Sequence, residues 1–168
     1  VQPVPAAAGP AELQGLPLTQ TVAHIGRPQV IQCVYAAELL KLACEAGAVI
    51  EVTAAVGDTV LELSPLLHVY AARQPLDESA LKNVFDIGDE RTFEQDPKYA
   101  IRLVVDIAIK ALSPAINDPT TAVLAMDQLH RMLRTVGKRY LRADELLDQY
   151  GQVRVIFRTP DWDDFVHL

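Results

Sequence analysis

The sequence predicts an α+β fold: a small β-rich subdomain with one helix, packed on a helical hairpin and completed by a late strand. Three observations carry this prediction. Short β-type segments separated by turn residues fill 23–72, two Asp-Pro steps introduce long helical segments within 73–168, and 152–157 again has a strand composition. We expect both parts to form one globular unit, preceded by a linker over 1–22.

Composition limits the possible functions. The chain has 168 residues, of which 50% are hydrophobic and 22% charged, as expected for one domain with a core. Fifteen Lys and Arg against 22 Asp and Glu give a net charge of −7, so we expect no nucleic-acid partner, because phosphate binding needs clustered cations. The longest apolar candidate, 101–112, falls short of the ~18 residues that a membrane helix needs.

Both ends of the sequence suggest a fragment. Residues 1–17 hold four prolines among small residues, a composition typical of a linker, without the basic and apolar regions of a signal peptide. The last ten residues begin like a helix, with Thr159 as a cap and Pro160 at the first helical position. We expect a longer protein, truncated here on both sides; the alternative is a native end with a short amphipathic tail.

The β-rich part is predicted from alternation and turn residues. A helix over 35–46 has apolar residues at spacings of three and four, and Gly47 ends it. The expected strands are 24–34, 48–54, 59–63 and 66–71.

The helical part is predicted from its caps. Asp96-Pro97 opens a helix to Leu112, and Asp118-Pro119 opens another to about Val136, because the carboxylate accepts first-turn N–H groups and proline needs no partner there. Pro114 ends the first helix, so the pair should form an antiparallel hairpin. Further helices are expected over 77–87 and 141–150, with a closing strand over 152–157.

The first hairpin helix is the most informative element. Its polar residues Lys98, Arg102, Asp106 and Lys110 are four apart, so they form one narrow stripe on a helix that we expect to be buried on most other sides. One interpretation is a solvent-facing ion ladder. The alternative is one wall of a polar site for a carboxylate or phosphate. The candidate ligand-binding residues are Arg91, Glu94, Asp96, Arg102, Asp106, Asn117, Asp118 and Thr121.

The end of the second hairpin helix is basic. Cations near a helix C-terminus are expected from the helix dipole; the alternative is contact with membrane phospholipid or an acidic partner. The residues concerned are Arg131, Arg134, Lys138, Arg139 and Arg142.

Several motifs resemble one known family. The stretch from Glu90 to Pro97, then Ile101-Arg102 with Asp106, and above all the Ser-Pro-x-x-Asn-Asp-Pro block that starts at Ser113, are similar to the soluble C-terminal region of the DUF2254 family of predicted bacterial membrane proteins. Ala115 stands where many members have glycine. The resemblance implies membrane helices upstream of this region, an inner-membrane location and a position on the cytoplasmic side. It implies no reaction and no catalytic residue.

Standard catalytic and cofactor motifs are missing from the sequence. The four histidines and two cysteines have no metal-ligand spacing, and no phosphate-binding glycine loop occurs, so we expect no cofactor and no metal site. Our first hypothesis is a non-enzymatic regulatory, assembly or ligand-sensing domain that forms a homo-oligomer. The second is an enzyme or small-anion binder that uses the candidate residues; the third is a protein–protein adaptor that uses alanine-rich faces.

Overall fold

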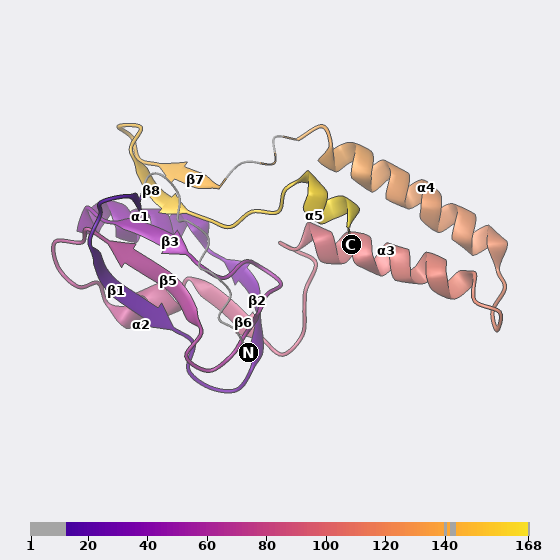
Figure 1. Cartoon of the computed structure of the whole chain (residues 1–168), viewed down its shortest axis with the longest axis horizontal. Helices are drawn as coiled ribbons and strands as arrows, with labels where there is room; N and C mark the ends of the chain where they lie inside the picture. Colours follow the sequence, from indigo (N-terminus) through magenta and orange to yellow (C-terminus); the bar gives the residue numbers. More distant parts are fainter. Residues whose placement is uncertain (1–12, 140, 142–143, 168) are drawn as a thin grey trace.

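The computed structural model describes residues 13–139, 141 and 144–167, and it shows a β body from which a helical hairpin projects (Figure 1). The strands are β1 (Leu18–Ala23), β2 (Gln29–Val34), β3 (Val49–Val52), β4 (Thr59–Val60), β5 (Pro65–Tyr70), β6 (Phe85–Gly88), β7 (Glu145–Leu147) and β8 (Val153–Ile156). The helices are α1 (Ala36–Ala46), α2 (Glu78–Lys82), α3 (Pro97–Ala111), α4 (Pro119–Val136) and α5 (Trp162–Val166). The expected α+β class is confirmed.

Two sheets build the body. The larger has the order β1-β5-β3-β8-β7, and the smaller has the order β4-β2-β6. All pairs are antiparallel except β3 with β8, which run parallel. Because β8 follows the hairpin in sequence and lies between β3 and β7, the chain leaves the body through α3 and α4 and returns to complete the same sheet.

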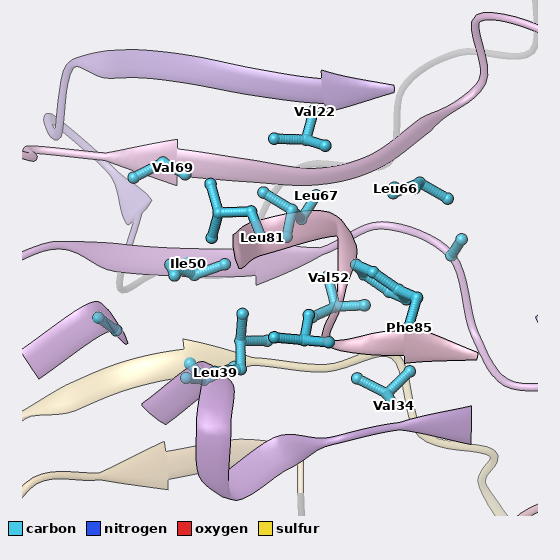
Figure 2. Packing of buried hydrophobic residues seen from close by; sticks show 14 of the residues in the cluster. Val22, Val34, Leu39, Ile50, Val52, Leu66, Leu67, Val69, Leu81 and Phe85 are labelled. Atoms are coloured by element: carbon cyan, nitrogen blue, oxygen red, sulfur yellow. The ribbon is translucent and has the colours of Figure 1, made fainter. Parts of the chain in front are cut away.

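The hydrophobic core lies within the body. Leu39 of α1, Ile50 of β3 and Leu67 of β5 are fully buried, and Figure 2 shows Leu39 and Leu81 of α2 converging on these strands. Among the described residues, the cluster that makes up this core takes no member from α3 or α4. The body is therefore held together by its own sheets and by α1 and α2.

The expectation that the first hairpin helix is buried on most sides is wrong. Ile109 of α3 is 62% exposed, and Leu112, the residue that caps the C-terminus of this helix, is 63% exposed. The hairpin is buried mainly along one face, where small residues let the two helices approach each other. The buried residues of α3 and α4 are Ile101, Ala108, Ala111, Ala122 and Ala125. When a helix is apolar on most sides, its sequence does not show whether the same chain or another one covers those sides.

Two predicted helices are corrected by the structure. In 77–87, α2 ends at Lys82, and Phe85–Gly88 form β6, which pairs with β2. In 141–150, Glu145–Leu147 form β7 instead of a helix, while 142–143 lie outside the described residues. The turn after β7 is organised by Asp148, which accepts hydrogen bonds from the backbone N–H groups of Tyr150 and Gln152.

Smaller differences concern the ends of elements. The expected linker over 1–22 overlaps β1 from Leu18 onward, and its residues 1–12 lie outside the described residues. The last helix is capped by Asp161 rather than by Thr159. The other predicted strands and α1 lie within a few residues of their expected positions, and Gly47 ends α1 in the left-handed conformation. The division at 72/73 into two subdomains stays a prediction.

Two leucine substitutions test where the core lies. Leu39→Ala should lower the free energy of unfolding by about 2–5 kcal/mol, because it leaves a cavity in the body. Leu112→Ala, on the exposed surface of the hairpin, should change it by less than about 0.5 kcal/mol in the monomer. Urea unfolding followed by circular dichroism at low protein concentration measures both values. Similar losses for the two variants would contradict this placement of the core.

Candidate functional site

One ion pair lies where the chain leaves the body and enters the hairpin. Asp96 is 3% exposed and caps α3 by accepting a hydrogen bond from the Tyr99 backbone N–H at 2.9 Å. Its other carboxylate oxygen accepts from Arg91, with Nε at 3.0 Å and Nη2 also in contact. The Arg91 guanidinium lies 4.8 Å from the centre of the Tyr99 ring. Both carboxylate oxygens of Asp96 are thus held by hydrogen bonds, as a buried charge requires.

Gly57 makes this arrangement possible on the side of the body. It has a φ of +89°, and a Cβ atom there would collide with Asp96 Oδ2 and lie 2.7 Å from Arg91 Nη2. The 54–58 turn can approach the ion pair this closely because Gly57 has no side chain, and any other residue at this position would prevent the contact. The Gly57 N–H donates in turn to the Ile31 carbonyl at 2.8 Å, which ties the turn to β2.

A cleft of about 810 Å³ lies beside this ion pair, at the base of the hairpin. Its walls are the 54–58 turn with neighbouring strand residues, the start of α3 and the segment 157–160 that leads to α5. The volume falls within the range of small-molecule sites. Lys98 of α3 and Asp164 of α5, 3.2 Å apart, bridge two of these walls.

The structure brings together only some of the candidate residues. Arg91, Asp96 and Arg102 line the cleft. Asp106 pairs with Arg102 one helical turn further on, with Nε and Oδ1 3.0 Å apart and both side chains about half exposed. Glu94 is exposed on the loop before α3 and does not line the cleft.

The remaining candidates lie at the opposite end of the hairpin. Asn117 occupies the turn with a φ of +46°, and Asp118 caps α4 by accepting hydrogen bonds from the backbone N–H and the hydroxyl of Thr121. The hydroxyl bond is the main cause that lowers the pKa of Asp118. Because α3 has 15 residues, this group lies about 22 Å from the cleft. The eight candidates therefore do not form one site.

Sequence reasoning missed some residues of the cleft. Lys98 was predicted as part of the polar stripe, but Tyr99, in the same first turn of α3, was not singled out although the Asp-Pro step indicated its position. Arg158 reaches the cleft only because β8 pairs with β3. This pairing joins segments that are far apart in the sequence, so no local pattern predicts it. The Asp164 carboxylate accepts from the Asp161 backbone N–H and from Lys98, and these two bonds lower its pKa.

Substitution of glycine tests the contact between turn and ion pair. Gly57→Ala should lower the free energy of unfolding by at least about 2 kcal/mol, because the methyl group displaces the buried Asp96 carboxylate in addition to straining the backbone. Gly151→Ala is the matched control, since Gly151 also has a positive φ (+76°) but has open space around it. That variant should lose only about 1 kcal/mol. Thermal or urea unfolding measures both values. Equal losses of unfolding free energy in the two variants would show that the close contact of Gly57 with Asp96 does not contribute to stability.

Comparisons with known proteins place the chain in a family without an assigned activity. Uncharacterized proteins of Mycobacterium bovis and of two Mycobacterium tuberculosis strains are 37% identical over 82 residues, which cover 49% of this chain and 16% of each relative. The match thus spans about one sixth of the length of these curated relatives. No solved structure matches the chain.

The family model covers nearly the whole sequence. Within the part of the chain that the structure describes, we find no helix with the length and apolar character needed to cross a membrane. The model that matches residues 4–168 is described as "Predicted membrane protein (DUF2254)". The chain belongs to this family, as the Asp-Pro and Ser-Pro-x-x-Asn-Asp-Pro motifs led us to expect.

Proposed function

We propose that this chain is a non-enzymatic assembly domain of a bacterial inner-membrane protein, and that the hairpin of α3 and α4 is its contact surface. The observation that carries the proposal is the exposure of large apolar side chains along a projecting element. These side chains are Leu103, Ile107, Ile109, Leu112, Ile116, Val123, Leu124 and Met126, each at least 38% exposed. Large exposed apolar side chains that gather on one element mark interaction sites.

Apolar residues of both helices face one side of the hairpin. Residues at spacings of three and four share a helix face, so Val105, Ile109 and Leu112 lie together on α3. Right-handed helical geometry puts Val123 and Met126 on the side of the antiparallel α4 that faces the same way. We call these five residues the apolar flank.

We assign a second copy of the chain as the occupant of the apolar flank. An apolar surface complements itself in a two-fold contact, and two hairpins that pack side by side form a four-helix bundle. A lipid-facing role is disfavoured because Arg102, Asp106 and Lys110 run along α3 beside the apolar rows, and charges at bilayer depth cost several kcal/mol. The membrane helices of the same protein are the alternative partner.

The polar candidates support assembly over catalysis. Asp96 and Asp118 cap helices, and Arg91 and Arg102 pair with acids, so each of these groups has a structural role within the chain. A catalytic cluster would need these groups to converge on one reacting position. Only the three candidates that line the cleft, Arg91, Asp96 and Arg102, are left for the enzyme hypothesis.

Oligomeric state tests the assembly proposal. The chain should be a dimer by light scattering coupled to size exclusion at tens of micromolar, and Ile109→Glu with Met126→Glu should make it a monomer, because two charges enter the buried centre of the contact. Leu61→Glu is the control, since Leu61 is 56% exposed on the β body. A monomeric parent chain, or dissociation caused equally by Leu61→Glu, would contradict the assignment of a second copy.

We also propose that the domain faces the cytoplasm. Cys33 and Cys44 are free thiols, as is usual in a reducing compartment. Burial is the main cause that raises the pKa of Cys33, with Asp86 and Glu94 adding to it, so the exposed Cys44 should react faster with maleimides.

Thiol labelling in cells tests this orientation. In the full-length protein, a membrane-permeant maleimide should label Cys44 in intact cells, whereas an impermeant maleimide should label it only after the cells are opened. Cys44→Ser identifies the signal of this residue. Labelling of intact cells by the impermeant reagent, lost in Cys44→Ser, would place the domain on the outer side.

A further inference from the structure

The cleft at the base of the hairpin has one apolar wall. Val52 of β3, which is 4% exposed, lines it together with Val56, Leu146 and Phe157. These side chains belong to the β body, and they face a space that is large enough for a drug-sized molecule. An apolar group of a ligand would be removed from water there, against side chains that pack on the protein core.

The charged residues that line the cleft carry more positive than negative charge. Four cations line it, Arg91, Lys98, Arg102 and Arg158, and three carboxylates, Asp58, Asp96 and Asp164. Each carboxylate already accepts hydrogen bonds from the protein, because Asp58 holds the Ala55 N–H at 3.0 Å in addition to the contacts of Asp96 and Asp164 described above. The three carboxylates therefore have structural roles within the protein.

Two of the cations are available for a ligand. Within the described residues, no hydrogen bond or ion pair is found for Arg158, and its charge acts at longer range on the Asp164 carboxyl, where it helps to lower the pKa. Arg102 bonds only to Asp106, which lies outside the cleft, and the two side chains are 50% and 53% exposed. Such surface pairs contribute little to stability, so Arg102 can exchange its partner for the head group of a ligand at small cost.

We propose that this cleft binds an amphipathic small-molecule anion, with a carboxylate or phosphate head group on Arg102 and Arg158 and an apolar body against Val52, Val56 and Phe157. Guanidinium groups suit both head groups because they donate two parallel hydrogen bonds. The ligand would touch the body, α3 and the segment leading to α5 at once. It would thereby stabilise the position of the hairpin relative to the body.

The chain contains a reporter for this contact. Trp162, the single tryptophan, lies in α5 next to the end of α4, where a Cβ on Gly137 would be 3.4 Å from its ring. Asp164 of the same helix lines the cleft. A ligand that contacts Arg158 and the start of α5 should therefore change the fluorescence of Trp162.

Titration of the chain with matched probes tests the proposal. Octanoate and octyl phosphate should raise the melting temperature and change Trp162 fluorescence saturably. Inorganic phosphate lacks the apolar body and 1-octanol lacks the charge, so each should bind at least tenfold more weakly. Equal binding of 1-octanol, equal binding of inorganic phosphate, or no saturable response to either octyl anion would overturn the proposal.

Variants locate the binding site. Arg102→Gln with Arg158→Gln should weaken octanoate binding at least tenfold, whereas Arg131→Gln with Arg134→Gln, on the outer side of α4, should leave it unchanged. Ile109→Glu with Met126→Glu removes the apolar flank and should also leave it unchanged. Loss of binding in that last pair would mean that the probe occupies the flank, and would overturn the cleft assignment whatever the oligomeric state.

Discussion

The buried contact of Arg91 with Asp96 is the constraint on which the arrangement of this molecule depends. Asp96 is almost completely removed from water, and a charge in that position is tolerated only with full hydrogen bonding. Its partners come from the loop before α3, from the first turn of α3 and, by close approach, from the Gly57 turn. One carboxylate thus fixes where α3 begins, where it meets the body and where the cleft opens.

Local chemistry explains which elements could be predicted from the sequence. Asp96 and Asp118 act through the first-turn N–H groups next to them in the chain, and both hairpin helices begin where the Asp-Pro steps predict. The β6 and β7 segments were predicted as helical because their strand character depends on β2 and β8, which lie far away in sequence. Short apolar runs do not distinguish the two structures until a pairing partner is known.

The candidate site was predicted only in part for the same reason. Arg91, Asp96 and Arg102 are close in sequence and do share the cleft, whereas Asn117 and Asp118 are separated from it by the length of α3. Arg158 arrives from the far end of the chain. The burial of α3 could not be predicted for a different reason. Its apolar pattern indicates that these side chains are buried, but it does not indicate whether this chain or another one buries them.

The parallel pairing of β3 with β8 has a consequence for the order in which the protein is made. Ile50 pairs with Val155, and the entire hairpin is synthesised between them. The hairpin helices use contacts between near neighbours, which form early, while the central sheet waits for a long loop to close. Until β8 arrives, β3 presents an open strand edge, the kind of surface on which nascent chains associate wrongly. A ribosome-bound intermediate with a finished hairpin and an unfinished body is therefore the stage at which a chaperone would be needed most.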